Sequence, residues 1–329
     1  MNKNLLKYAG KKLIKLALLL FAVSIITFGL VVASPMDPVK TNVGQAALGA
    51  MSDEQKAKVE DYWGVNTPPV ERYTNWAKDF VKGDMGTSLI YRQPVKEVIK
   101  DKLKNSLPLM TMAWVFSGVI GFAMGCLAAM NRGKWQDKLV RGYSVAVSST
   151  PAFWLALLLL IIFGVKLHWF PVGFSVPIGM EIGKVTLADR FYHGILPAIA
   201  LSITGVAPMA LHTREKMIDI AESDYFTFAR SRGLKSRQLF WQHGFRNALI
   251  PAITLQFASI GEIIGGSVLV EQVFSYPGIG QAAVRAGLGS DMPLLLGITL
   301  ISSLIVFVGN FLADILYNLV DPRMRRRAV

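Results

Sequence analysis

The residue types that most often catalyse reactions or bind metals are few in this chain, and they lie far apart. The four histidines and the single cysteine show no recognisable spacing: His168, His193, His212, His243 and Cys126. The HExxH zinc motif and the GxSxG nucleophile motif are both absent. A GxxxxGK[ST] phosphate loop is also absent, so the chain does not hydrolyse ATP by that route. The sequence therefore predicts no catalytic constellation, no metal site and no cofactor bound by this chain.

Two carboxylates, Glu262 and Asp314, stand inside otherwise uncharged runs. Ionisable side chains at membrane depth usually face the interior of a helix bundle or a wet cavity. Glu262 is therefore expected either to form structural hydrogen bonds or to line a transport path. Pro151 and Pro208 are candidates for the same path, because a proline frees a backbone carbonyl, although ordinary packing kinks explain them equally well. Glu271 is expected near the outer end of its helix, within easy reach of water.

The elements that must position these residues are long apolar helices. Of the 329 residues, 52% are hydrophobic and only 17% are charged, which is more apolar than the usual soluble profile. Six runs have almost no charge, and each reaches the roughly 20 residues that a helix needs to cross the hydrocarbon core: 16–36, 105–131, 142–165, 191–213, 247–270 and 292–320. The sequence thus predicts an all-α integral membrane protein with six transmembrane helices, rather than a soluble protein with six buried helices.

Details of three of these helices can be anticipated. The N-terminal helix resembles a signal peptide, but its apolar stretch of about 20 residues exceeds the 7–15 of a cleaved signal, so we expect a retained anchor. Gly121 and Gly125 form a GxxxG pair that lets a neighbouring backbone approach closely. The third helix is expected to begin near Tyr143 and to carry Pro151 one third of the way along.

The net charge of +13 is unevenly distributed between the segments that connect the helices. Residues 1–15, 131–141, 212–247 and 321–329 carry a strong excess of Lys and Arg, whereas the other three connections are nearly balanced. Positive charge accumulates on the cytoplasmic side of membrane proteins. Both termini and the segment 212–247 are therefore expected in the cytoplasm, and the basic charge indicates topology rather than nucleic-acid binding.

The longest polar interruption in the C-terminal half is Glu222–Pro251. Asp224 suits the first turn of a helix, an apolar and aromatic face follows at helical spacing, and Gly233 fits the stop. Ser236 then suits the cap of a second helix that carries Leu239, Phe240 and His243 on one side. The first helix is too short to be stable alone in water. It needs a surface to lie against, and we interpret that surface as belonging to another protein.

The connection between the first two spans is about seventy residues long, far beyond a typical loop. It contains Trp63, Tyr73, Trp76 and Phe80, with balanced charge, and residues 71–83 carry apolar side chains at helical spacing before a GDMG turn. We expect a small helical subdomain or lid. It either packs over the helix bundle or offers a contact surface to an external partner.

Several stretches together resemble the permease subunits of ABC importers in the oligopeptide, dipeptide and nickel family. They are DYFTFARSRGL with RNALIP, VFSYPGIG with DMPLLLG, TPAFWLALLLLIIF with WFPVG, RYTNWAKDFVKGDMGTS, and the terminal DPR. The resemblance covers nearly the whole chain and points to the subunit type with an extended first external loop. The general Glu-Ala-Ala motif is replaced by Thr227-Phe228-Ala229, and the proline lies 18 residues after Gly233, which is similar to the peptide-type subfamily.

This resemblance implies the six-helix bundle of a type I importer permease. Its parts would be a basic N-terminus at 1–15, a first helix at 16–34, an external loop subdomain at 35–104, a core of helices two to six at 105–320 and a basic tail at 321–329. Within the core, a cytoplasmic loop at 214–247 would couple the permease to separate ATPases. The coupling residues implied are Asp224, Tyr225, Phe228, Ala229, Arg230, Arg232, Gly233 and Leu234.

The implied partners are a second homologous permease subunit, two cytoplasmic ATPase subunits that bind ATP and Mg, an external substrate-binding protein, and the lipid of a bacterial inner membrane. Cargo would be peptides first, and nickel or a metal chelate second. Two rival interpretations are a stand-alone carrier with Glu262 or Asp314 as its proton site, and a membrane scaffold that only recruits a cytoplasmic enzyme.

Overall fold

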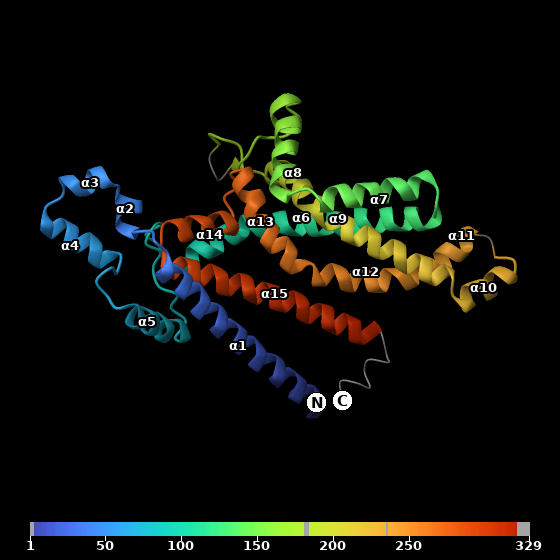
Figure 1. Ribbon diagram of the computed structural model, residues 1–329, viewed down its shortest axis with the longest axis horizontal. Helices are drawn as coiled ribbons and strands as arrows, with labels where there is room; N and C mark the ends of the chain where they lie inside the picture. Colours follow the sequence, from blue (N-terminus) through green and yellow to red (C-terminus); the bar gives the residue numbers. More distant parts are fainter. Residues whose placement is uncertain (1–2, 181–183, 235, 321–329) are drawn as a thin grey trace. The chain divides into compact units, whose positions relative to one another are not determined.

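A computed structural model of the chain describes residues 3–180, 184–234 and 236–320. The described part is helical apart from turns and one isolated bridge between Thr87 and Pro94 (Figure 1). Four of its helices are long and apolar enough to span a membrane: Gly10–Ala33, Val95–Met130, Leu187–Ala221 and Met292–Leu316. Two bent helix pairs raise the number to six if each pair is one span. The expected basic tail, 321–329, lies outside the described residues.

The chain forms two compact units, one from residues 1–106 and 277–307 and the other from 107–276 and 308–329. The first unit contains the long connection between the first two spans, which folds into four helices. Its elements are α1 (Lys3–Ala33), α2 (Pro38–Val43), α3 (Gln45–Ala50), α4 (Asp53–Tyr62), α5 (Pro69–Val81), the start of α6 (Val95–Met130), α14 (Ile279–Leu288) and the start of α15 (Met292–Val320).

Aromatic residues fix α5 within this first unit, as the expected helical subdomain requires. Trp76 is buried with Leu296 and Leu300, and its ring stacks on Phe80 at 5.1 Å between centroids. The hydroxyls of Tyr73 and Ser24 share a hydrogen bond of 2.8 Å. The predicted helix at 71–83 is thus confirmed, and the GDMG turn follows it with Gly83 and Gly86 at φ of +92° and +81°, where glycine carries no steric penalty.

The second unit contains the helices that follow. They are the rest of α6, α7 (Trp135–Ser148), α8 (Ala152–Leu159), the π-helical η1 (Leu160–Lys166), α9 (Leu187–Ala221), α10 (Asp224–Ser231), α11 (Ser236–Leu239), the π-helical η3 (Phe240–Phe245), α12 (Arg246–Ala258), α13 (Ile260–Val273) and the end of α15. The GxxxG pair works as predicted, because a Cβ on Gly125 would lie 2.5 Å from the Ala210 carbonyl oxygen and one on Gly121 2.9 Å from that of Val206. Helices α6 and α9 therefore pack backbone against backbone.

The third predicted span differs from the expected continuous helix. Helix α7 already begins at Trp135, and a bend of 106° separates it from the Ala152–Lys166 helix. Pro151 precedes α8 instead of lying inside a helix, because its ring disfavours helical backbone at the residue before it. Pro208, in contrast, lies inside the continuous α9. Helix α6 also begins at Val95, ten residues before the apolar run that predicted it.

Candidate coupling site

Helix α10 has the bounds that its sequence predicts. It begins at Asp224, whose carboxylate suits the positive end of the helix dipole, and its last residue is Ser231. Gly233 follows with φ of +84°, the left-handed conformation that ends many helices. Ser236 is the first residue of the next helix, whereas it was expected to be the capping residue just before that helix. The side chain of His243, expected on one side of this helix, is not among those that the structure describes.

One face of α10 is buried against its own chain. Phe226, Ala229 and Leu239 form a buried cluster, and Ile220, Ala221 and Leu234 pack around it. The expectation that this short helix finds no support within its own chain is therefore wrong. Two neighbouring segments, the end of α9 and the end of α11, supply the apolar surface that a helix of eight residues requires.

The opposite face of α10 is open. The exposed fraction is 64% for Phe228 and 45% for Tyr225, and the Arg232 guanidinium lies 6.0 Å from the centre of the Phe228 ring. A groove of about 500 Å³ runs along this face, lined by Tyr225, Phe228, Ala229, Arg232 and Leu234. Five of the eight predicted coupling residues thus meet in one groove, and Asp224, Arg230 and Gly233 flank it. The face combines aromatic area with positive charge, which suits an apolar protein surface with acidic side chains.

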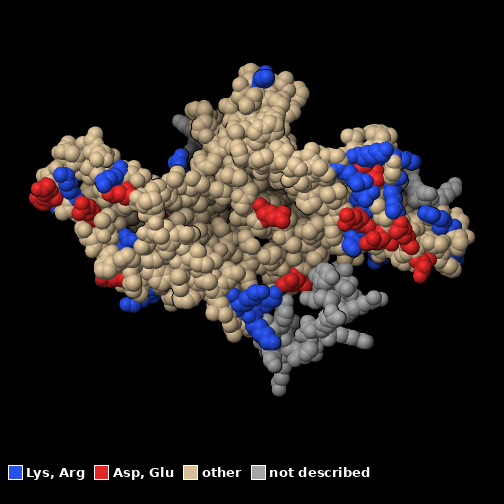
Figure 2. Space-filling view, in the orientation of Figure 1, with Lys and Arg blue, Asp and Glu red and all other residues tan. Residues whose placement is uncertain are grey.

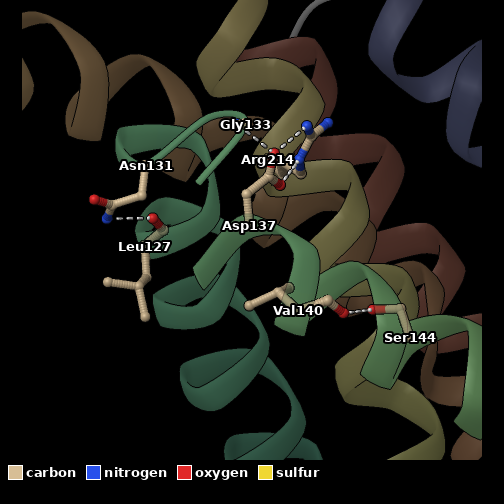
Figure 3. A network of polar contacts seen from close by, with 7 residues as sticks. All are labelled: Leu127, Asn131, Gly133, Asp137, Val140, Ser144 and Arg214. Carbon is tan, nitrogen blue, oxygen red and sulfur yellow. Dashed lines mark hydrogen bonds and ion pairs between the residues drawn. The ribbon is translucent and has the colours of Figure 1, made fainter. Parts of the chain in front are cut away.

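Charge gathers around this end of the second unit (Figure 2). In the same unit, the start of α7 is joined to α9 by an ion pair with little exposure, drawn in Figure 3. Both Asp137 oxygens accept from Arg214, at 2.5 Å and 2.9 Å, and the Gly133 amide donates to the same carboxylate at 2.9 Å. The sequence prediction missed this pair, although Asp137 is the only acid in its basic turn and was the available signal.

The three predicted path residues lie on separate elements of the second unit. Glu262 is exposed in the first turn of α13, Pro208 is exposed on α9, and Pro151 is exposed just before α8. Glu271 corrects an expectation, because its side chain is fully buried rather than within reach of water. Its helix continues two residues further, and the segment that follows is also buried at Phe274 and Tyr276.

Comparisons with known proteins agree with this architecture. The family model of binding-protein-dependent transport system inner membrane components matches residues 121–326, more than half of the chain. The chain belongs to this family. It is 34% identical over 307 residues to an oligopeptide transport system permease protein of Bacillus subtilis, covering 93% of this chain and 95% of the relative. It is 33% identical over 322 residues to a glutathione transport system permease protein of Escherichia coli K12, and this match covers 98% of this chain and 99% of the relative.

Membership in the binding-protein-dependent transport family confirms the predicted resemblance. The chain is a multi-pass inner-membrane component of a transport system, and its role is transport rather than catalysis. Systems of this family work with a binding protein and with an ATPase. Among the described residues, no group of three or more His, Cys, Asp or Glu side chains is placed to hold a metal ion.

Proposed function

We propose that this chain is the permease subunit of a peptide importer whose ATPase docks on the open face of α10. The observation that carries the proposal is the division of α10 into two faces. Phe226 and Ala229 hold the helix to its own chain, while Phe228 and Arg232 remain available to a partner. A partner with an apolar groove and acidic rim would bury the exposed rings and pair with the guanidinium.

A displacement of α10 would be transmitted to the membrane-spanning part of the chain through α9. The two helices are separated only by Glu222 and Ser223, and the buried cluster around Phe226 joins them side by side. When ATP binding closes the two ATPases, α10 would move with its ATPase and carry the end of α9 along. Gly233 gives the chain beyond α10 the backbone freedom to follow.

The charge distribution supports a definite topology. Placing the basic segments 1–15, 131–141 and 212–247 in the cytoplasm puts α10 on the side of ATP and the helices α2–α5 outside, where a binding protein delivers cargo. A cysteine introduced at Lys58 should react with a membrane-impermeant maleimide in spheroplasts, whereas one at Asp219 should react only after lysis. The reverse pattern would contradict the proposed orientation.

The path itself is proposed to lie between this chain and a second, homologous permease subunit. Glu262 is exposed on α13, which is long and apolar enough to span a membrane only when it is joined with α12 as one bent pair. An ionised carboxylate facing lipid is costly, so such residues usually face protein or a wet cavity. A second subunit that covers α13 would convert the surface around Glu262 into the wall of a water-filled path.

Peptides are the proposed cargo. The two relatives described above are named for oligopeptides and for glutathione, itself a small peptide, and they align with nearly the entire chain. Nickel, the alternative cargo, has no supporting observation among them. A stand-alone proton-coupled carrier is disfavoured because the family depends on a binding protein.

The docking proposal is tested by placing one negative charge at either of two exposed positions of the same helix, one inside the groove and one outside it. Phe228→Asp should reduce ATPase co-purification roughly 10-fold or more, because exposed aromatic anchors dominate such interfaces. Thr227→Asp is the matched control, since Thr227 is also exposed on α10 but does not line the groove. If Phe228→Asp retains the ATPase as well as Thr227→Asp does, the ATPase docks elsewhere. Ala229→Glu is unsuitable, because it would bury a charge within the chain itself.

A further inference from the structure

Helix α7 contacts α9 at three successive positions along its length, which we call levels. The Tyr143 hydroxyl donates to the Ile203 carbonyl at 3.2 Å. One level on, Val140 packs with Ala210 and with Ala128 of α6 in a buried cluster. The third level is the ion pair between Asp137 and Arg214. Gly121 and Gly125 also allow α6 to lie in close contact with α9. The three helices therefore pack together, and we call them the α6–α7–α9 group.

The ion pair is the only one of these three levels that is both charged and buried. The Asp137 side chain is 3% exposed and that of Arg214 16%, and the contact is bidentate. The amide of Gly133, in the turn before α7, supplies a further donor to the carboxylate. Planar two-bond pairs of this type fix orientation as well as distance. The pair therefore sets the angle at which the start of α7 meets α9.

A second ion pair joins the same two segments closer to α10. Arg132, in the turn between α6 and α7, pairs with Glu222, the residue that follows α9. Both side chains are more than half exposed, and exposed pairs contribute little to stability. Its importance lies in its position, two residues before the first residue of α10. The turn between α6 and α7 is thus connected to the junction through which α10 would act.

We propose that Asp137 and Arg214 are positioning residues that make α6 and α7 move together with α9 when α10 is displaced. This inference rests on the proposed docking of the ATPase at α10. With the ion pair intact, a displacement of the α9 end turns the α6–α7–α9 group as one body. Without it, the start of α7 can slip along α9, and part of the displacement is lost before it reaches the bend between α7 and α8 that leads to Pro151.

The test uses the complete complex with its ATPase and binding protein, reconstituted in proteoliposomes. Asp137→Asn removes the charge but keeps an acceptor for the Gly133 amide. Uptake of a radiolabelled tripeptide and ATP hydrolysis are measured together, at equal amounts of protein. We expect ATPase co-purification and ATP hydrolysis to be retained, while uptake per ATP falls roughly 5-fold or more, the lower end of typical coupling between distant sites.

The matched control is Asp219→Asn. Asp219 also pairs with a base, Lys216 at 3.2 Å, but the partner lies on the same helix and both side chains are exposed. Its loss should leave uptake per ATP unchanged. Arg214→Lys keeps the charge without the fork geometry and should give an intermediate ratio. If the Asp137→Asn protein does not accumulate in the membrane, Arg214→Lys becomes the decisive variant.

A purely structural role would lower the amount or thermal stability of the complex and leave uptake per ATP intact in the protein that remains. An unchanged ratio in Asp137→Asn, or in Arg214→Lys when that variant is decisive, overturns the proposal. Failure of the docking proposal is separately visible, because Phe228→Asp would then retain the ATPase whatever the effect of the ion pair.

Discussion

Asp291 is a single side chain that holds the end of the long first connection against the start of α15. It is fully buried and accepts hydrogen bonds from the Ser88 hydroxyl at 2.6 Å, the Ile90 amide at 3.0 Å and the Leu294 amide at 3.2 Å. Asp291→Ala would leave three donors without their acceptor. Each unsatisfied buried group costs about 1–3 kcal/mol, so the variant should lower the unfolding midpoint and expose residues 88–92 to protease.

A carboxylate within the long first connection itself provides the comparison. Asp84 accepts a hydrogen bond from the Gly86 amide at 2.8 Å but is exposed, so water replaces it when it is removed. Asp84→Ala should therefore change the unfolding midpoint far less. Equal effects of the two substitutions in a thermal unfolding assay of the purified complex would show that Asp291 is not the anchor described.

Residue type and local spacing predicted that a short helix begins at Asp224 and stops before Gly233, but not which way each side chain faces. In a helix of two turns, Phe226 and Phe228 are equally apolar, and only the positions of α9 and α11 decide that the first is buried. Glu271 shows the same limit, because its place near the end of a helix did not predict that its side chain is fully buried. The partner of Asp137 is 77 residues away, a distance at which spacing along the chain carries no information.

At the scale of helices, the contact between α6 and α9 depends on the absence of a side chain. A Cβ at position 125 would lie 2.5 Å from the Ala210 oxygen and 2.6 Å from the Thr213 Cβ. Gly125→Ala should therefore separate the two helices and cost about 1–3 kcal/mol, as overpacking of a filled core does. The thermal midpoint of the complex, followed by loss of soluble protein on heating, measures this change.

Gly142→Ala, on α7, is the corresponding control. Gly142 also lies in a helix, but nothing stands within 4 Å of the Cβ it lacks, so the added methyl group should be tolerated. A destabilisation by Gly142→Ala as large as that by Gly125→Ala would argue against close packing as the reason for the glycine at 125.

The existence of the long helices was predictable, because apolar runs of membrane length are unambiguous. The angles between successive helices were not predictable. The bend of 106° between α7 and α8 lies at Thr150-Pro151, where proline marks the place but the angle depends on what α7 packs against. The early start of α6 has a related cause. Its first ten residues are polar on the outside, while Val95, Val98 and Ile99 are buried, so a protein surface rather than lipid covers them.

At the scale of the whole molecule, the long connection between the first two spans and the segment around α10 have different tasks. The first folds into helices α2–α5, of which α5 packs its aromatic side chains against α1 and α15, and the second keeps one face of a short helix open. In the proposed function, the first would face a binding protein outside and the second an ATPase inside, as expected for a binding-protein-dependent transport system. The charge distribution and the motifs of the sequence predict this division, and the maleimide labelling and the Phe228→Asp experiment described above test it.

The most direct test of the account is peptide uptake by proteoliposomes that contain the complete permease and ATPase complex, with binding protein outside and ATP inside. We expect accumulation of a labelled peptide only when the binding protein and ATP are both present. We also expect Phe228→Asp to abolish it and a proton gradient to have no effect. Accumulation driven by a proton gradient without ATP would contradict the account and identify a stand-alone carrier instead.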